Sequence, residues 1–292
     1  MALRLLPLAL LLVLVGCTRD GPEKNVPVEE ELAARFAFPA AAAGSLEEGA
    51  RRVRRGIGAF AATYPAPGGG EVTGYVVREL APEDGDRAGV VFAHGAGGGA
   101  DDFLNEAHEL ARRGAVVLTI DSPFVRSDDP DIREGRAELQ ETYDTMVRWV
   151  QELRLGLDLL VEEYGVDPRR LALIGYSMGA QPATIAAALD ARLRALVLMA
   201  PQAYPSGLPD DLLARRLFTA IDTVEFVDNL APAKVLLQAG EWDELVPNRD
   251  AEVLDESASE PAELRWYDAG HELGQHAAVE RVEWLVEVLG LR

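Results

Sequence analysis

The pentapeptide Gly-Tyr-Ser-Met-Gly at residues 175–179 constrains the fold of this chain more than any other stretch. It follows a strongly apolar run at 171–174 and opens an alanine-rich stretch with helical spacing. This order predicts a strand, a sharp turn and a helix. Side chains at the two flanking positions of such a tight turn would collide, and Ser177 is expected in a strained backbone conformation with its hydroxyl exposed. Ser177 is therefore the first candidate nucleophile.

The rest of the chain predicts an α/β fold. Apolar runs bounded by Gly, Pro and Asp alternate with amphipathic stretches, which is typical of parallel strands joined by helices. Residues 57–64 and 72–78 flank Pro-Ala-Pro-Gly-Gly-Gly and predict an antiparallel opening hairpin. Further strands are expected at 89–93, 115–120, 171–175, 195–199, 235–238 and 263–267, and helices at 101–113, 141–164, 180–189, 248–257 and 275–289. We therefore expect about eight mostly parallel strands with helices on both faces, and reactive residues beyond the carboxyl ends of the strands.

The first residues predict an export signal. Arg4 precedes an apolar stretch from 5 to 15, which is shorter than the about 20 apolar residues that a membrane-spanning helix needs. The stretch ends in Leu-Val-Gly-Cys, which resembles the bacterial lipobox, so we expect lipidation of Cys17 with acyl chains such as palmitate. Cys17 is the only cysteine, so no intramolecular disulfide can form. The alternative is an ordinary cleaved signal with an incidental cysteine.

The chain divides into three expected parts. These are a signal peptide at 1–16, a lipidated tether at 17–45 with one short helix at 30–38, and a single α/β domain at 46–292 that includes a candidate lid at 201–231. We expect the protein to be anchored in the bacterial cell envelope outside the cytoplasm. Thr18, instead of an aspartate, favours the outer membrane in a cell with two membranes.

Charge narrows the range of partners. Removing residues 1–16 takes away one positive charge, Arg4, so the net charge moves from −21 to −22. Such a chain repels nucleic acid and other anionic polymers, so we expect no nucleic-acid partner. The basic cluster Arg51–Arg55 could touch anionic lipid headgroups, but a solvated face is the favoured interpretation.

A serine nucleophile needs a histidine that accepts its proton. His271 directly follows the last expected strand and is the best candidate base. His276 begins or lies within the final helix, and His108 falls on a helix where a solvated or packed role is the ordinary expectation. His94 ends a strand before a run of glycines, where we expect it to fix the turn by hydrogen bonds.

The triad also needs an acid that holds the histidine, at a strand end between nucleophile and base. The strand at 235–238 runs through Gly240 into a loop with three acidic residues. Asp243 stands three residues past this glycine and ahead of Val-Pro, and it is our choice. Glu241 and Glu244 are the alternatives.

An acyl-transfer site must also stabilise negative charge on the substrate carbonyl oxygen. One expected donor is the backbone N–H of Met178, the residue after the candidate nucleophile. The other is expected in the glycine-rich turn after the strand at 89–93, at Ala96, with Gly97 as second choice. The turn lacks the spacing and the lysine of a phosphate-binding loop, so nucleotide binding is disfavoured.

Four motifs stand in a characteristic order: His-Gly-Ala-Gly at 94–97, Gly-Tyr-Ser-Met-Gly at 175–179, Gly-x-x-Asp-x-x-Val-Pro at 240–247 and Ala-Gly-His at 269–271. Together they resemble the α/β-hydrolase superfamily, especially its dienelactone-hydrolase-like and esterase/lipase branches, over residues 53–291. The resemblance implies serine-dependent acyl transfer to water from a small-molecule ester, without a metal or an organic cofactor. The dienelactone hydrolases use a cysteine nucleophile, and the corresponding residue here is Ser177.

The alternatives to an esterase are a zinc metalloprotease, a serine peptidase and an inactive binding module. His271 and His276 are five residues apart, a spacing that turns the two rings away from each other on a helix and disfavours a shared zinc ion. A serine peptidase of the same fold is an alternative, although no propeller domain precedes the catalytic part. A catalytically inactive binding module is the second alternative, since the fold alone does not prove activity.

Substrate choice is expected to depend on two stretches without a regular pattern, 122–140 and 201–231. Four aromatic residues could line an acyl or leaving-group pocket or could equally be core: Phe124, Tyr204, Phe218 and Trp242.

Overall fold

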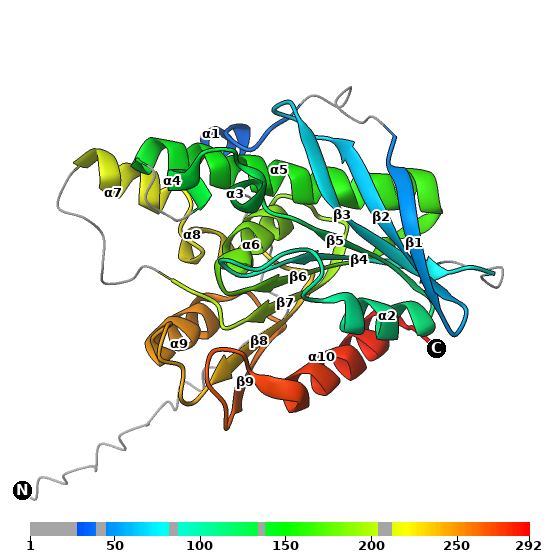
Figure 1. The fold of residues 1–292 in the computed structure, drawn as a ribbon. Helices are drawn as coiled ribbons and strands as arrows, with labels where there is room; N and C mark the ends of the chain where they lie inside the picture. Colours follow the sequence, from blue (N-terminus) through cyan, green and yellow to red (C-terminus); the bar gives the residue numbers. More distant parts are fainter. Residues whose placement is uncertain (1–27, 39–44, 82–86, 134–137, 204–211) are drawn as a thin grey trace, which may run out of the picture.

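The computed structural model describes residues 28–38, 45–81, 87–133, 138–203 and 212–292, and all structural statements below concern these residues. Within them, nine strands form one sheet in the order β1-β2-β3-β5-β4-β6-β7-β8-β9 (Figure 1). The strands are β1 Glu47–Arg54, β2 Ile57–Pro65, β3 Glu71–Glu79, β4 Arg87–Ala93, β5 Ala115–Ile120, β6 Val166–Tyr176, β7 Leu193–Met199, β8 Lys234–Gly240 and β9 Ala262–Tyr267.

The sheet is antiparallel at one side and parallel at the other. The pairs β1–β2, β2–β3 and β3–β5 are antiparallel, and every pair from β5–β4 to β8–β9 is parallel. The predicted opening hairpin is confirmed as β2 and β3, with Ile57 opposite Glu79 and Pro65 opposite Glu71. Helices cover both faces of the parallel part, so most residues of its central strands are buried and their sequences read as continuous apolar runs.

The ninth strand, β1, is the one that the sequence reading did not predict. All of its eight residues are exposed, so it lacks the alternation of apolar and polar residues that identifies a half-buried strand. The basic cluster Arg51–Arg55 lies at its end, and Arg51 and Arg52 pair with Phe60 and Ala59 of β2. A charged run therefore forms the edge strand of the sheet, where charge also discourages pairing with another chain.

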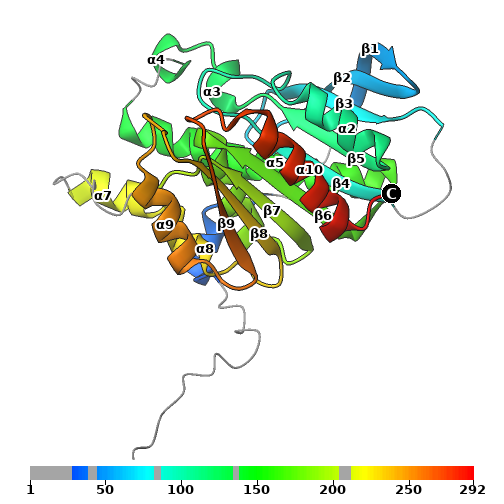
Figure 2. The same ribbon diagram turned by 90° about the horizontal axis from the view of Figure 1, so that it is seen from below.

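Helices lie in two layers. Helices α2 (Leu104–Arg112) and α10 (Gly274–Leu289) lie side by side on one face (Figure 2). The opposite face is covered by α5 (Leu139–Tyr164), α6 (Ala180–Ala188), α8 (Val224–Val227) and α9 (Asn248–Ser257). The remaining helices are α1 (Glu30–Ala34), α3 (Pro123–Arg126), α4 (Pro130–Arg133) and α7 (Leu212–Thr219), with a 3₁₀ turn at Ser177–Gly179.

Short helices occupy the two stretches that showed no regular pattern. Helices α3 and α4 lie within 122–140, and α7 and α8 lie within the candidate lid at 201–231. Helices α3, α4 and α8 have four residues each, about one turn, which is too short to produce a recognisable apolar period. The candidate lid also includes residues 204–211, which lie outside the described residues.

Part of the segment expected as a tether packs against the domain. Helix α1 lies beside α5 (Figure 1), and Phe36, which follows it, is fully buried. The Phe36 ring meets the ring of Phe226 in α8 edge-on, with centroids 5.8 Å apart. Cys17 and the expected signal peptide lie outside the described residues. In the described part of the chain, no helix combines the length and the apolarity needed to cross a membrane.

The six parallel strands, β4 to β9, end at the same edge of the sheet. Strands β4, β5, β6, β8 and β9 end at Ala93, Ile120, Tyr176, Gly240 and Tyr267. Because carboxyl ends of parallel strands meet at the same edge, the loops that follow these strands converge there. All the candidate site residues of the domain belong to these loops or directly follow these strands.

Candidate active site

Ser177 lies at the turn between β6 and α6 in the strained conformation that the sequence predicted, with a φ of +52°. A Cβ added at Gly175 would lie 2.5 Å from the carbonyl oxygen of Gly179, and one at Gly179 would lie 2.4 Å from that of His94. Both distances are shorter than any side chain tolerates, so both glycines are required for this turn. The strain holds the serine hydroxyl out of the sheet edge.

The structure brings Ser177, His271 and Asp243 together. His271 Nε2 lies 2.8 Å from Ser177 Oγ, and His271 Nδ1 lies 2.8 Å from Asp243 Oδ2. Asp243 Oδ1 accepts the N–H groups of Leu245 and Val246, both at 2.9 Å, so this carboxylate acts as an acceptor throughout. Nδ1–H therefore donates to Asp243, and Nε2 is left free to accept the serine proton.

The geometry separates Asp243 from its two acidic neighbours. The Asp243 side chain is only 4% exposed, whereas Glu241 and Glu244 are exposed. Among the described residues, neither glutamate makes a hydrogen bond to His271. A buried carboxylate with three hydrogen-bond donors is held in one orientation, which an exposed glutamate is not.

The other histidines lie apart from this triad. His108 on α2 has its Nε2 3.1 Å from the carbonyl oxygen of Arg54, so it packs against the end of β1. His276 on α10 is 80% exposed and lies 3.4 Å from Glu280. Within the described ranges, no group of three or more His, Cys, Asp or Glu side chains is arranged to hold a metal ion.

His94 fixes the glycine-rich turn, as the sequence analysis expected. Its Nε2 accepts the N–H of Ser122 at 2.9 Å, and its Nδ1 lies 2.7 Å from the carbonyl oxygen of Gly95. Because a backbone N–H can only donate, Nε2 carries no proton, and Nδ1–H donates to Gly95. The Gly95 carbonyl also accepts the N–H of Gly98 at 3.2 Å. His94 is buried, and its ring packs against Trp149 with centroids 5.6 Å apart.

The two predicted oxyanion donors directly follow Gly95 and Ser177, which lie against each other. A Cβ added at Gly95 would lie 3.3 Å from Ser177 Cβ, so the turn rests directly against the candidate nucleophile. Ala96 follows at an exposed position, and Met178 follows Ser177 in the 3₁₀ turn. In a planar trans peptide the N–H points opposite to the preceding C=O, so the fixed Gly95 carbonyl sets the direction of the Ala96 N–H. The choice of Ala96 over Gly97 stays a prediction.

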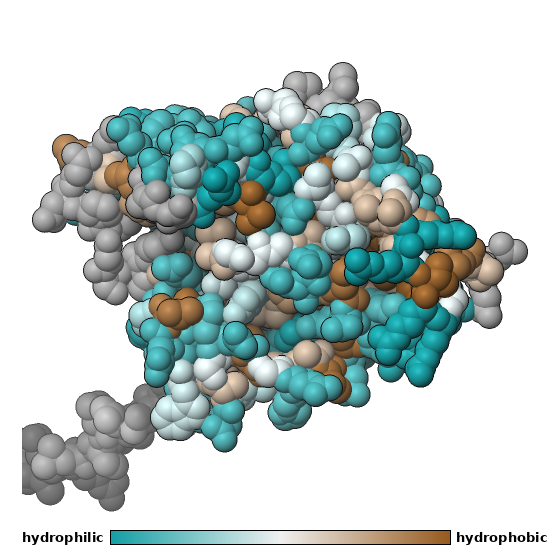
Figure 3. Space-filling view, viewed as in Figure 1, coloured by the Kyte–Doolittle hydropathy of each residue, from teal (hydrophilic) through white to brown (hydrophobic). Residues whose placement is uncertain are grey.

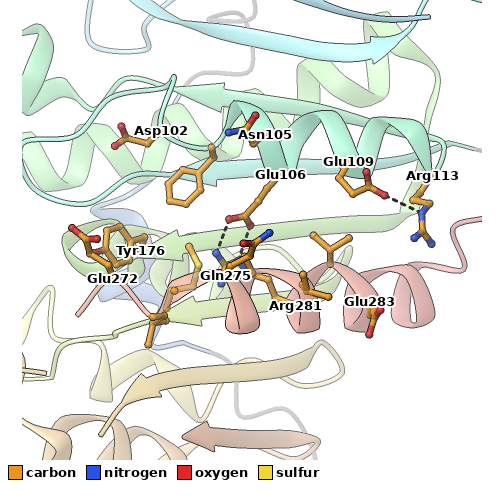
Figure 4. A pocket seen from close by; sticks show the side chains of 17 residues that line it. Asp102, Asn105, Glu106, Glu109, Arg113, Tyr176, Glu272, Gln275, Arg281 and Glu283 are labelled. Atoms are coloured by element: carbon orange, nitrogen blue, oxygen red, sulfur yellow. Dashed lines mark hydrogen bonds and ion pairs between the residues drawn. The ribbon is translucent and has the colours of Figure 1, made fainter. Parts of the chain in front are cut away.

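A groove of about 910 Å³ runs between α2 and α10 (Figure 4), and its lining includes Tyr176 and Glu272, the chain neighbours of Ser177 and His271. At its near end lie Tyr176, whose ring centroid is 5.3 Å from that of His271, and the carboxylates of Asp102 and Glu272. Burial raises the pKa of the Tyr176 phenol, and the carboxylates of Glu272, Asp243 and Asp102 raise it further, so the hydroxyl stays protonated at neutral pH. The ion pair between Glu106 and Arg281 crosses the groove at 2.6 Å.

The aromatic residues considered for a substrate pocket differ in burial. Phe124 is buried edge-on against Trp149, with centroids 6.1 Å apart, as a core residue would be. Trp242 is 66% exposed beside Asp243, and its Nε1–H donates to Asp268 at 2.7 Å. Phe218 in α7 is half-buried, and Tyr204 lies outside the described residues.

Sequence reasoning missed Asp121 and Ser122, which follow β5 and contact the glycine-rich turn. Asp121 Oδ1 accepts the N–H of Ala100 at 2.8 Å, and Ser122 holds His94. Ser122 also caps α3 by accepting the N–H of Val125 at 3.3 Å. The signal that could have found them is Asp-Ser-Pro directly after an apolar strand, because serine followed by proline is a typical helix start.

Comparison with known proteins agrees with this architecture. A Bacillus subtilis protein named as a hydrolase, MhqD, is 28% identical over 212 residues, which cover 68% of this chain and 93% of that protein. The acetyl xylan esterase from Paenibacillus sp. R4 superposes with a TM-score of 0.71 at 20% identity, covering 88% of this chain and 90% of that one.

Acetyl xylan esterase 1 from Thermoanaerobacterium sp. JW/SL YS485 superposes with a TM-score of 0.72 at 15% identity, covering 90% of this chain and 95% of that one. At such identities the two structural likenesses concern the fold. The sequence of residues 90–288 matches the alpha/beta hydrolase family, and this range includes all the candidate site residues of the domain. The chain therefore belongs to the alpha/beta hydrolase family.

Proposed function

We propose that this protein is a serine hydrolase that cleaves carboxylic esters through an acyl-enzyme intermediate. The observation that carries the proposal is the continuous chain of hydrogen bonds from Ser177 Oγ through His271 to Asp243, with both bonds at 2.8 Å. A serine hydroxyl is a poor nucleophile by itself, and this arrangement supplies the base that activates it. The motif order favours the esterase/lipase and dienelactone-hydrolase-like branches of the family.

In the proposed reaction, Ser177 Oγ attacks the ester carbonyl carbon while His271 Nε2 takes the hydroxyl proton. Asp243 stabilises the imidazolium that forms. The tetrahedral intermediate then collapses, and His271 gives its proton to the leaving alcohol. In the second half, His271 deprotonates a water molecule that attacks the acyl-enzyme, and Ser177 recovers its proton as the carboxylic acid leaves.

The carbonyl oxygen becomes negatively charged in both tetrahedral intermediates. We assign its stabilisation to the backbone N–H groups of Ala96 and Met178. Removing one such donor costs about 2.7 to 4 kcal/mol of transition-state stabilisation in other serine hydrolases. The close contact between Gly95 and Ser177 supports the assignment, because it brings the glycine-rich turn within reach of the reacting carbon.

A fluorophosphonate probe tests the nucleophile. It should label the wild-type protein covalently and fail to label Ser177→Ala. The matched control is Ser257→Ala at the end of α9, which should be labelled like the wild type. A folded wild-type protein that stays unlabelled would favour the inactive binding module. A panel of p-nitrophenyl esters of graded chain length, with a peptide p-nitroanilide alongside, then separates an esterase from a peptidase and measures the preferred acyl length.

We also propose that Cys17 carries a lipid that anchors the protein in the cell envelope. The lipobox-like sequence before the only cysteine supports this. Cells fed labelled palmitate should incorporate label into the wild type and not into Cys17→Ser, and globomycin should block processing of the wild type. Processing that is insensitive to globomycin would refute the anchor.

A further inference from the structure

Two consecutive residues hold both ends of the glycine-rich turn at 94–100. At the first end, the N–H of Ser122 donates to His94 Nε2 at 2.9 Å. At the last end, the N–H of Ala100 donates to Asp121 Oδ1 at 2.8 Å. The corner formed by Asp121 and Ser122 after β5 therefore fixes the path of the whole turn, including the peptide between Gly95 and Ala96.

Arg126 anchors this corner. Its Nε donates to the carbonyl oxygen of Asp121 at 3.1 Å, and its Nη1 donates to the carbonyl oxygen of Glu71 at the start of β3. Its Nη2 donates to Glu152 Oε2 on α5. One guanidinium thus joins the corner to a strand and to the longest helix. A guanidinium suits this role because its donors point in several fixed directions, whereas the single ammonium group of a lysine could bond well in only one of them.

Glu152 is placed where a charge is costly. Its side chain is fully buried, and burial raises its pKa to about 7 although Arg126 opposes the rise. Oε1 has no hydrogen-bond partner among the described residues, so the proton can reside there while Oε2 continues to accept from Arg126. Buried ion pairs are poor devices for stability alone, because desolvation offsets their attraction. The position of this pair suggests a different use.

We propose that Arg126 and Glu152 are positioning residues for the oxyanion hole. They hold the Asp121–Ser122 corner, the corner holds His94, and His94 holds the Gly95 carbonyl, which sets the direction of the Ala96 N–H. This inference rests on the proposed function of that N–H group. Neither residue touches the substrate in this scheme, and both act through the turn.

The main test measures kcat and KM for p-nitrophenyl acetate in Arg126→Ala. Displacing a catalytic group by about 1 Å can cost about 100-fold in rate. We expect kcat to fall about 10- to 100-fold with KM within about twofold of the wild-type value, because the developing oxyanion is felt only in the transition state. Ethylguanidinium should restore part of the lost kcat, since the Arg126 side chain is 16% exposed and its space is open to solvent.

The matched control is Arg192→Ala. Arg192 also links a turn to a helix, because its Nη2 donates at 2.6 Å both to Asp190 in the turn before β7 and to Asp158 on α5. It precedes β7 and so lies at the amino edge of the sheet, away from the site. This variant should lower the melting temperature while kcat stays at the wild-type value. An equal loss of kcat in both variants, or an unchanged kcat in Arg126→Ala, would overturn the proposal.

A second variant covers the case in which Arg126→Ala does not fold. Arg126→Lys keeps the charge and the aliphatic stem but loses the fork, so it should melt near the wild type with kcat reduced about 3- to 10-fold. An unchanged kcat in this variant also overturns the proposal. Failure of the proposed function gives a different result, because the wild-type protein itself would then neither react with fluorophosphonate nor cleave the ester.

Discussion

At the scale of single residues, the histidine tautomer decides whether the proposed reaction can begin. Asp243→Asn places an amide N–H opposite His271 Nδ1, which favours the tautomer with its proton on Nε2, where the serine proton must go. In a serine protease the same change lowers kcat by about 10⁴-fold. We expect a loss of similar size for p-nitrophenyl acetate. Glu244→Gln, an exposed neighbour in the same loop, is the matched control and should keep its kcat; the opposite ranking would assign the acid to Glu244.

The free energy of unfolding should depend on pH through the side chain of Glu152. Glu152 has a pKa of about 7 in the folded protein, above its value near 4.5 in the unfolded chain. Between these values the folded state binds the additional proton, so the contribution of Glu152 to the free energy of unfolding falls as pH rises from about 4.5 to 7. Glu152→Gln removes this titration.

Urea unfolding at pH 5 and at pH 8 measures the effect. The difference in unfolding free energy between Glu152→Gln and the wild type should shift in favour of the variant at pH 8, by up to roughly 3 kcal/mol for a pKa change of this size. Comparing the two proteins cancels the titration of all other groups. A difference that stays constant between the two pH values would show that Glu152 does not titrate in this range.

The sequence could indicate Ser177, Asp243 and His271 because each follows an apolar strand within a short motif. It could not indicate Arg126 or Glu152, whose partners are distant in the chain and whose sequence neighbours form no motif. Their contact depends on how α3 and α5 pack over the sheet, which is a property of the whole fold. Positioning residues of this kind are therefore found only once the fold is known.

At the scale of elements, prediction worked wherever an apolar period was long. The expected helix at 248–257 matches α9 at both ends, and the final helix matches α10 to within one residue. The helix expected at 101–113 is shorter in the structure, because a turn precedes Leu104. Strand β6 begins five residues earlier than expected, since Asp167, Arg169 and Arg170 interrupt the apolar run without interrupting the strand.

Phe36, which follows the C-cap of helix α1, should contribute to the stability of the folded protein. Phe36 is fully buried against α8, so Phe36→Ala should lower the unfolding free energy by about 3 to 5 kcal/mol, as loss of a core aromatic does. Phe38 is half-buried beside Arg154, with the guanidinium carbon 5.3 Å from its ring centroid, and Phe38→Ala should cost less. Chemical denaturation of both variants measures the difference. Equal and small losses would mean that this segment does not belong to the folded core.

At the scale of the whole molecule, the protein carries a large excess of negative charge. The chain carries 49 acidic against 28 basic residues, and Figure 3 shows hydrophilic side chains over much of one face, with smaller apolar patches between them. Many arginines are engaged by nearby carboxylates, as at Arg78, Arg249 and Arg281. Carboxylates also lie at the candidate site, where Asp102 and Glu272 flank Tyr176 at the near end of the groove.

This negative field should discriminate between substrates by charge. An ester with an anionic leaving group or acyl chain must approach Ser177 against the net charge of the molecule and the two carboxylates, so its kcat/KM should lie below that of a neutral ester of the same size. Salt screens exposed charges over about 10 Å at 0.1 M, so the gap should narrow as ionic strength rises. The neutral ester should respond little.

Glu272→Gln separates the local charge from the general one. Glu272 is exposed next to His271, so the variant should raise kcat/KM for the anionic ester relative to the neutral ester by a fewfold at low salt. Glu162→Gln removes the same charge from the exposed end of α5, near the amino edge of the sheet, and should leave that ratio unchanged. Equal ratios in the two variants would mean that only total charge matters, and no salt dependence in any variant would mean that substrate approach is insensitive to charge.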